Sequence, residues 1–331
     1  MPNPIIAEVT RGSIVESRHR GAFVVTNHNG AVVSGAGDFS AAFFPRSAIK
    51  AFQCLPLIES GAAARFGLND QEIALCCSSH SGEPEHVRVA RSILAKAGVA
   101  ETCYECGASN PMATEATYQL VRQGERPQQV HNPCSGKHAG MMAFAKHLGA
   151  PLEGYVKIDH PVQRAVAKCL SRYCDVDVVA APYGIDGCSL PSWAFPLDKV
   201  ALGFARLGVE QNDAARWVIT AARAHPFMIA GKKRFDTMLM QAVPRLFIKL
   251  GAEGVFCGCI PHAGLGFALK CDDGTVRGAE VAIALVLTTL SVWTPVEQTT
   301  LKEFADQPVT NANKMAVGEV RAVNNASQTR V

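Results

Sequence analysis

The 331-residue sequence contains few charged residues (18%) and few aromatic residues (7%). It has 32 Lys and Arg against 29 Asp and Glu, a net charge of +3, and its longest basic run is Lys232, Lys233 and Arg234. Nucleic-acid-binding proteins ordinarily carry a basic patch, so we do not expect nucleic acid as a partner. The low charge and the 48% apolar content also exclude a disordered chain.

Long hydrophobic runs are also missing. The longest, residues 281–293, contains Thr288, Thr289 and Ser291, and it is shorter than the roughly 20 residues that span a bilayer. We therefore expect no membrane partner. Residues 1–20 show no basic region followed by an apolar core, which favours a cytoplasmic protein.

Cysteine, in contrast, is frequent, with 12 residues. The cytosol keeps thiols reduced, so we expect reduced thiols, and a disulfide framework is the weaker alternative. Several, among them Cys169, Cys259 and Cys271, are expected to be small core residues, and a few could be metal ligands. Cys103 and Cys106 form a lone C-x-x-C, which we interpret as structural or surface thiols.

Strand patterns occur at both ends of the chain and helical patterns lie between them. This arrangement predicts an α/β (α+β) fold in which one antiparallel sheet is built from both chain ends. We expect a single domain over residues 1–331, with a sheet lobe from about 1–40 and 245–331 and a helical lobe over about 41–244. We expect the polar tail after Asn311 to be partly mobile. The expected strands are 5–9, 13–16, 22–26, 73–77, 254–260 and 265–270. The main expected helices are 84–97, 112–123, 137–148, 161–173, 211–224, 235–243 and 279–290, and Asn69 or Asp70 is expected to cap another helix.

A possible nucleophile lies in the segment FPRSAIK. If Pro45 opens a helix, Ser47 and Lys50 lie one turn apart on the same face. A serine needs a base, and a lysine can be that base when burial lowers its pKa. The alternative is chance, because Ser and Lys at this spacing occur on many surface helices.

Two later motifs give this pair a context. Ser79 lies in the loop SSHSG, and Lys249 begins K-x-G before a predicted strand pair. The order S-x-x-K, serine loop, K-x-G resembles serine β-lactamases and penicillin-binding proteins, and the late segment resembles serine-dependent glutaminases of the same fold. Lys249 could instead be an exposed lysine after a helix, and Lys270 and Lys233 are rival late lysines.

A second cluster joins HNPCSGKHAG, residues 131–140, to YGIDGC, residues 183–188. Cys134, Cys188, a nitrogen donor and water would complete the four-coordinate shell of Zn²⁺. On chemistry alone His138 is the ordinary nitrogen donor, and two buried cysteines without a metal are the alternative. Asp186 could bind a substrate ammonium, orient a ligand or only form a turn.

Together these residues resemble one family. RGAFVVTNHNGAVV, FPRSAIKAFQCLPLIESGAAARFGL, CCSSHSGEPEHV, HNPCSGKHAGMMA and PYGIDGCSLPSWAFPL resemble the Rhizobium etli-type, class 3 L-asparaginases along nearly the whole chain. The resemblance implies a β-lactamase-like fold, a homodimer, and hydrolysis of L-asparagine to L-aspartate and ammonia.

The resemblance also implies roles for individual residues. It makes Ser47, Lys50, Ser79 and Lys249 catalytic, and it makes Cys134, Lys137 and Cys188 the ligands of a zinc ion that supports substrate binding. Lys137 thereby replaces His138 as the nitrogen ligand. Substrate-binding roles are expected for Asp186, His138 and Arg46. The rival functions are a glutaminase or penicillin-recognising hydrolase on the same fold, and a non-catalytic zinc- or amino-acid-binding protein.

Overall fold

The computed structural model describes residues 2–324, and the chain divides into two compact units. The sheet unit contains residues 2–48, 195–209 and 239–324, and the helical unit contains residues 49–194 and 210–238. The expectation that residues 1–331 form one domain, with the lobe boundaries given above, stays a prediction.

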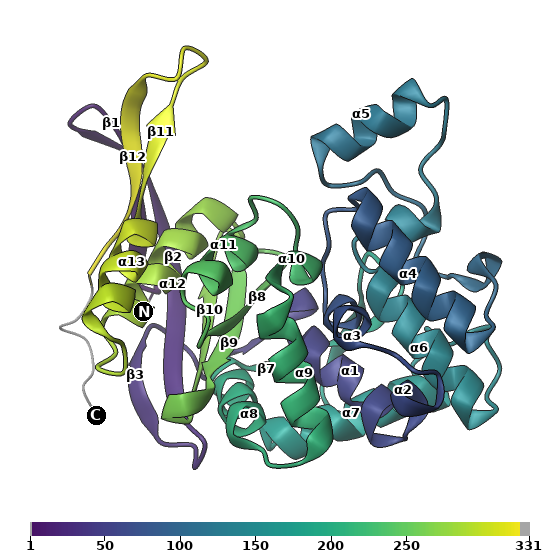
Figure 1. Ribbon diagram of the computed structural model, residues 1–331. Coiled ribbons are helices and arrows are strands. Elements are labelled where there is room, and N and C mark those ends of the chain that lie inside the picture. The colour runs from purple at the N-terminus through teal and green to yellow at the C-terminus, as the bar shows by residue number, and fades with distance from the viewer. Residues whose placement is uncertain (1, 325–331) are drawn as a thin grey trace. The chain divides into compact units, whose positions relative to one another are not determined.

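The sheet unit is built on an antiparallel sheet with the strand order β11-β12-β1-β2-β10-β9-β8, and β3 pairs with β2 (Figure 1). Strands from the two ends of the chain therefore alternate in one sheet, which confirms the expected α/β fold class. The strands are β1 (Ile5–Arg11), β2 (Ile14–Asn27), β3 (Val32–Ala36), β8 (Phe247–Gly251), β9 (Val255–Ile260), β10 (Leu265–Cys271), β11 (Asp306–Thr310) and β12 (Ala316–Ala322).

Two details of this sheet differ from the sequence-based expectation. The expected strands 13–16 and 22–26 are parts of one long strand, β2, whose first half is largely exposed. The expectation of a partly mobile tail after Asn311 is wrong for residues 316–322. These residues form strand β12, which pairs with β1 and buries Val320. Residues 325–331 of that tail lie outside the described residues.

Helices α8 (Leu197–Val209), α12 (Val276–Thr288) and α13 (Pro295–Ala305) complete the sheet unit, with the short pair β4 (Ala42–Phe43) and β7 (Phe195–Pro196) and the turn η4 (Pro261–Ala263). Helix α8 packs on β10, and α12 packs on β1 and β12. A small apolar cluster of Ala7, Val9, Val281 and Val320 joins α12 to those two strands.

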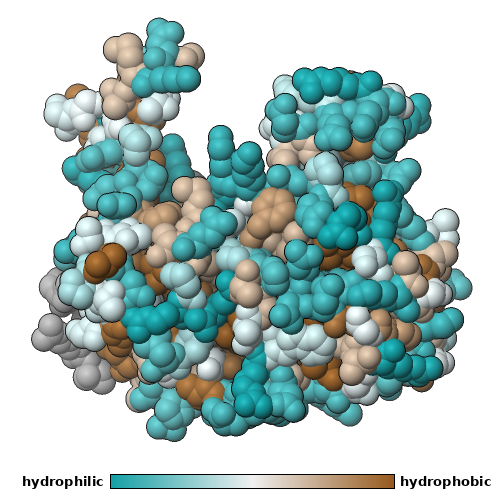
Figure 2. Space-filling model, viewed as in Figure 1, coloured by the Kyte–Doolittle hydropathy of each residue, from teal (hydrophilic) through white to brown (hydrophobic). Residues whose placement is uncertain are grey.

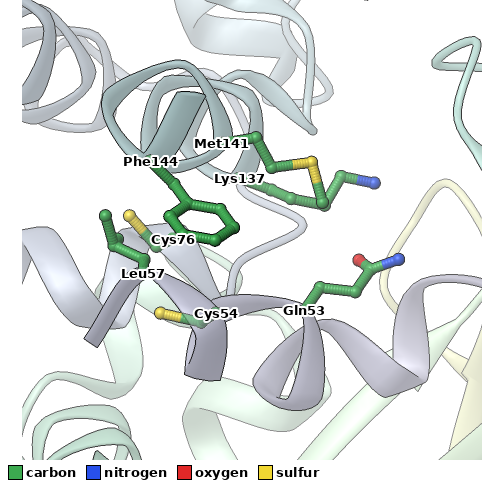
Figure 3. Close-up of a pocket in the computed structure, with 8 residues that line it drawn as sticks. Gln53, Cys54, Leu57, Cys76, Lys137, Met141 and Phe144 are labelled. Carbon is green, nitrogen blue, oxygen red and sulfur yellow. The ribbon is translucent and has the colours of Figure 1, made fainter. Parts of the chain in front are cut away.

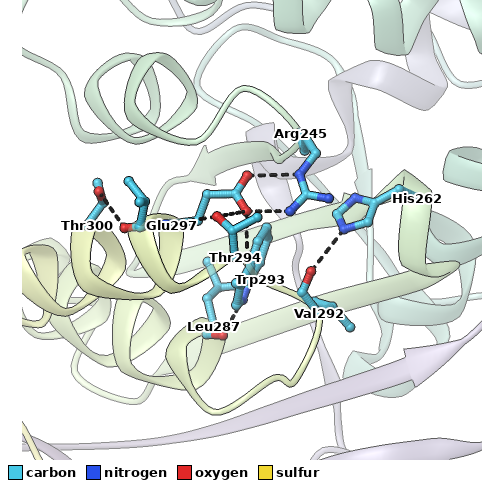
Figure 4. A network of polar contacts seen from close by, with 9 residues as sticks. Arg245, His262, Leu287, Val292, Trp293, Thr294, Glu297 and Thr300 are labelled. Carbon is cyan, nitrogen blue, oxygen red and sulfur yellow. Dashed lines mark hydrogen bonds and ion pairs between the residues drawn. The ribbon is translucent and has the colours of Figure 1, made fainter.

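A polar network holds α13 in the sheet unit (Figure 4). The Arg245 guanidinium, just before β8, binds the Glu297 carboxylate through two nitrogens, with Nε 2.9 Å from Oε1. Glu297 also accepts from the backbone N–H of Thr294 at 2.9 Å and so closes the capping box of α13. One carboxylate therefore fixes both the helix start and its link to the sheet.

The helical unit consists mainly of short helices: α1 (Lys50–Glu59), α2 (Ala62–Arg65), α3 (Asp70–Cys76), α4 (Pro84–Ala97), α5 (Thr114–Arg122), α6 (Ser135–Leu148), α7 (Pro161–Cys174), α9 (Asp213–Ala224) and α10 (Pro226–Ile229), with the 3₁₀ turns η2 (Glu101–Cys103) and η3 (Gln129–His131) and the hairpin β5 (Tyr183–Ile185) and β6 (Pro191–Trp193). The turn η1 (Arg46–Ile49) and helix α11 (Phe235–Ala242) each extend across a boundary between the units.

The expected strand over residues 73–77 is wrong. Asn69 and Glu72 form a capping box that begins α3, and the run is uniformly apolar because this helix is buried.

Hydrophilic and hydrophobic residues are interspersed on the face shown in Figure 2, and hydrophilic residues predominate around α5, at the upper right. Among residues 2–324, none of the helices is both long enough and apolar enough to cross a membrane. All 12 cysteines lie in this range and are free thiols.

Candidate active site

The S-x-x-K segment lies where the chain passes from the sheet unit to the helical unit. Arg46 and Ser47 belong to η1 in the sheet unit, and Lys50 is the first residue of α1 in the helical unit. The pairing of Ser47 with Lys50 stays a prediction, because the two residues belong to different elements and different units. The sequence predicted a helix from Pro45, whereas the α-helix begins five residues later.

The backbone is strained next to Ser47. Arg46 has a φ of 52°, in the left-handed region that non-glycine residues rarely adopt. Such a conformation costs about 1–3 kcal/mol and persists only where the surrounding structure enforces it. Ser47 itself is half-buried, and the backbone N–H of Ala48 donates to the Pro45 carbonyl at 3.1 Å.

Lys249 belongs to the same unit as Ser47. It lies on strand β8 and is fully buried, so it is not the exposed lysine after a helix that was the alternative. Its Nζ donates to the Leu250 carbonyl at 2.7 Å. A Cβ on Gly251 would lie 2.6 Å from the Pro45 oxygen, so the end of β8 lies directly against η1.

Lys50 is completely buried in the helical unit, and its amine contacts three acceptors. The Nζ atom donates to the Ser78 carbonyl, to Ser79 Oγ at 2.9 Å and to Cys134 Sγ at 3.2 Å. Burial lowers the pKa of Lys50, and the negative charge of Cys134 opposes that shift. The amine thus joins the predicted serine loop to the predicted metal cluster.

The loop that carries Ser79 is fixed on both sides by backbone hydrogen bonds. The N–H of Ser79 donates to the Ile229 carbonyl at 2.9 Å, and the N–H of His80 donates to the Pro133 carbonyl at 3.1 Å. The buried His80 ring also lies 2.8 Å from Ser135 Oγ through Nε2. Ser79, which is half-buried, is therefore held between residues near 133–135 and residues near 229.

Close helix packing brings these motifs together. A Cβ on Gly136 would lie 2.4 Å from the Leu75 carbonyl oxygen, so only glycine lets α6 approach the end of α3 this closely. The serine loop follows α3 and Cys134 precedes α6, and their juxtaposition depends on this contact.

The three predicted zinc ligands also lie together. Lys137 Nζ lies 3.3 Å from Cys188 Sγ, and the Cys188 thiol is hydrogen-bonded to Cys134. Cys134 is the N-cap residue of α6, Lys137 follows one turn later, and Cys188 lies between the hairpin strands β5 and β6. Lys137 and Cys188 are buried and Cys134 is half-buried.

The electrostatics of this cluster favour a thiolate at Cys134. The hydrogen bond from Cys188 and the nearby ammonium groups of Lys137 and Lys50 hold the pKa of Cys134 well below its usual value, against the effect of burial. The same hydrogen bond and burial raise the pKa of Cys188. Burial alone would lower the pKa of Lys137, but Cys134, Cys188 and Asp186 raise it. Two sulfurs and an amine in one buried cluster form a donor set that zinc accepts once thiol and amine protons leave, so these residues fit the expected ion.

The predicted substrate-binding residues lie in different settings. Asp186 is half-buried in the β5–β6 turn, and its carboxylate accepts from the Gly187 N–H at 2.7 Å. His138 is fully buried on α6, with Nδ1 2.7 Å from the Tyr155 hydroxyl. Arg46 is half-buried on η1. Their roles in binding substrate stay predictions.

Several residues that position the site were not predicted from the sequence. His80, Ser135 and Ile229 were given no role, although they anchor the serine loop. His80 and Ser135 could have been found from the polar segments SSHSG and HNPCSG, because polar side chains that become buried need hydrogen-bond partners. The partner of Ser79 near residue 229 had no sequence signal, since a backbone carbonyl can come from any residue.

A small cavity lies beside the predicted metal cluster (Figure 3). It has room for about one water molecule, too little for an amino-acid substrate. The Lys137 amine points away from the sulfur and aromatic groups of the lining, and Gln53 is the other polar residue on that side. The lining residues are Gln53, Cys54, Leu57, Cys76, Lys137, Gly140, Met141 and Phe144.

A sequence model of the L-asparaginase II family matches residues 7–322. No curated protein matches the chain.

Among solved structures, the crystal structure of Mglu in its native form in 4.3 M NaCl has 13% sequence identity to this chain and a TM-score of 0.41. The match covers 78% of this chain and 58% of the Mglu chain. The chain thus spans less than two thirds of that protein. A β-lactamase from Mycobacterium bovis, Mb2281c, has 14% identity and a TM-score of 0.38, over 86% of this chain and 94% of its own.

Proposed function

Because the chain belongs to the L-asparaginase II family of amidohydrolases, we propose that it hydrolyses L-asparagine to L-aspartate and ammonia. We further propose that it belongs to the Rhizobium etli-type, class 3 group, on the motifs described above. The observation that carries the chemistry is Lys50, a fully buried amine 2.9 Å from a serine hydroxyl and three residues from another serine. Burial lowers the pKa of Lys50, and an amine that loses its proton more easily can act as a base.

In the proposed reaction, Ser47 Oγ attacks the side-chain amide carbon of asparagine while Lys50 takes its proton. The C–N bond then breaks, a proton passes to the leaving nitrogen, and ammonia departs from an ester on Ser47. Water hydrolyses this ester, aspartate leaves and the serine hydroxyl is restored. Ser79, hydrogen-bonded to Lys50, and Lys249 are assigned the relay of protons to the leaving group.

Zinc held by Cys134, Lys137 and Cys188 would supply a fixed positive charge that seats the substrate. Zinc there would also fix the loops over residues 131–140 and 183–190, and Asp186 is proposed to receive the substrate ammonium. Arg46 and His138 are proposed to complete substrate binding. We also propose a homodimer, which light scattering on the purified chain would test.

The experiment that tests this proposal is mass spectrometry of an acyl-enzyme trapped with asparagine, together with ammonia release by the Ser47→Ala variant. We expect the modification on Ser47 and a loss of kcat of several orders of magnitude with folding intact. A modification on Ser79 would reverse the roles of the two serines, and full activity of Ser47→Ala would exclude the mechanism.

Substrate identity is decided by the same ammonia assay. Faster release from glutamine than from asparagine would make the protein a glutaminase, and turnover of a chromogenic β-lactam would make it a penicillin-recognising hydrolase. Asparagine binding by calorimetry without any ammonia would favour the non-catalytic alternative.

A further inference from the structure

A second group of metal-binding side chains lies in the sheet unit, outside the candidate active site. Cys271 is the last residue of β10 and pairs with Gly21 of β2, and His19 lies two residues before Gly21 on the same strand. Asp273 lies in the turn that follows β10. Strand pairing therefore brings together side chains that are more than 250 residues apart in the sequence.

The three side chains are in direct contact. His19 Nδ1 lies 2.6 Å from Asp273 Oδ2, and Cys271 Sγ donates to Asp273 Oδ1 at 3.1 Å. One ligand atom from each residue lies within 4.8 Å of the other two. Among residues 2–324, no other group of three or more His, Cys, Asp or Glu residues brings its ligand atoms this close together.

The surroundings make this group both rigid and accessible. Only 4% of His19 is exposed and Cys271 is fully buried, whereas the Asp273 side chain is 44% exposed, so an ion could enter past the carboxylate. A Cβ on Gly278 would lie 2.8 Å from the His19 ring, so the first turn of α12 packs directly on that ring. The backbone N–H of Thr275 donates to Asp273 Oδ1 at 2.9 Å and fixes the carboxylate.

One buried atom in this group has no partner among the described residues. The Nε2 atom of His19 makes no hydrogen bond, although its ring is buried. Since Nδ1 faces the Asp273 carboxylate, either position of the ring proton leaves Nε2 unsatisfied in the protein alone. An imidazole, a thiol and a carboxylate form a donor set typical of Zn²⁺, which often has three protein ligands and one water.

We propose that His19, Cys271 and Asp273 bind a zinc ion at a site separate from Cys134, Lys137 and Cys188. Zinc bonds of about 2.0–2.3 Å in a tetrahedron place ligand atoms roughly 3.5 Å apart, so the present contacts widen slightly as the ion enters. The thiol releases its proton to solvent on binding. The ion ties β2, the end of β10 and the start of α12 together, which is a structural role.

The test counts zinc in a chain that lacks the other cluster. A Cys134→Ser/Cys188→Ser variant, dialysed against dilute zinc and then against buffer, is expected to keep one zinc per chain. Adding Cys271→Ser should remove this ion, whereas adding Cys257→Ser, which changes a buried thiol on β9, should not. Titration with Co²⁺ adds a spectroscopic check, because a thiolate-to-cobalt absorption band should appear and depend on Cys271.

The half-exposed Asp273 supplies a variant that does not disturb the core. Asp273→Asn should weaken zinc binding by about 10-fold or more, since it removes a charged ligand. If the double cysteine variant does not fold, the same measurement on the otherwise unchanged chain should give two zinc ions, and one after Asp273→Asn or Cys271→Ser. No zinc beyond the Cys134 cluster, or unchanged affinity in Asp273→Asn, would overturn the proposal.

Discussion

The amine of Lys50 donates a hydrogen bond to Ser79 Oγ at 2.9 Å, across 29 residues of sequence. Lys50 begins α1, and Ser79 lies in the loop after α3. The contact is buried on the lysine side, where a charged amine has little access to water. A lysine in this setting gives up its proton more readily than an exposed one, and that property supports the proposed role of Lys50 as a base.

Replacing Lys50 with methionine should therefore abolish most activity without unfolding the protein. Methionine keeps much of the length of the buried side chain but cannot accept a proton, so kcat should fall by about 10²–10⁴-fold, the usual contribution of a general base. Ammonia release from asparagine measures the effect. Lys168→Met, an exposed change on α7, is the control and should keep full activity. Equal activity of the two variants would remove Lys50 from the mechanism.

The sequence predicted the sheet from both chain ends because strand alternation and turn signals are local. The order of Ser47, Ser79 and Lys249 along the chain supported the family resemblance, and their catalytic roles stay predictions. At α3 the sequence predicted a helix beginning at Asn69 or Asp70, which the capping box confirms, but it assigned residues 73–77 to a strand, because this buried part of the helix is apolar on all sides and has no visible period. It failed at β12 for the opposite reason, because a strand with one buried residue, Val320, resembles a polar tail.

The contacts of Lys50 could not be predicted from spacing either. The sequence paired Lys50 with Ser47, three residues away, and the structure adds Ser79 and Cys134 as hydrogen-bond partners. Those contacts depend on how closely α6 approaches α3. That distance is set by backbone packing at Gly136, which in the sequence is one glycine of 28.

Removal of the predicted zinc should affect binding of asparagine more than its chemistry. Cys188→Ser leaves two of the three predicted ligands, so we expect loss of bound zinc and a raised KM, with a smaller change in kcat. Metal analysis and steady-state kinetics measure this. Cys169→Ser, a buried thiol on α7, is the matched control and should keep zinc and KM. A fall in kcat at constant KM would instead give the metal a direct part in the reaction.

The close contact at Gly136 predicts a large effect of a single methyl group. In Gly136→Ala the new Cβ would lie 2.4 Å from the Leu75 oxygen, so α6 must move away from α3. Overpacking of this kind costs about 1–3 kcal/mol, and the shift should also lower activity, because the serine loop and Cys134 flank this contact. Thermal unfolding and ammonia release are the two measurements. Gly187→Ala, whose Cβ would have no atom within 4 Å, should unfold near the wild-type temperature; if both variants unfold there, the packing argument is wrong.

The Arg245–Glu297 pair predicts a stability that depends on pH. The hydrogen bond from Arg245 lowers the pKa of Glu297 to about 2. Because the folded pKa is depressed, the pair stabilises the protein above the unfolded pKa of about 4.3, and this contribution is lost as pH falls from there toward 2. Arg245 is 37% exposed, so solvent screening limits the stabilisation by this ion pair.

Because Glu297→Gln also weakens the capping bond to Thr294, it should lower the free energy of unfolding by about 1 kcal/mol and the melting temperature by about 2 °C at neutral pH. Glu303→Gln, an exposed change on the same helix, should leave the melting temperature unchanged. The difference between wild type and Glu297→Gln should shrink steadily below pH 4, and a difference independent of pH would show that the carboxylate charge has no part in holding α13.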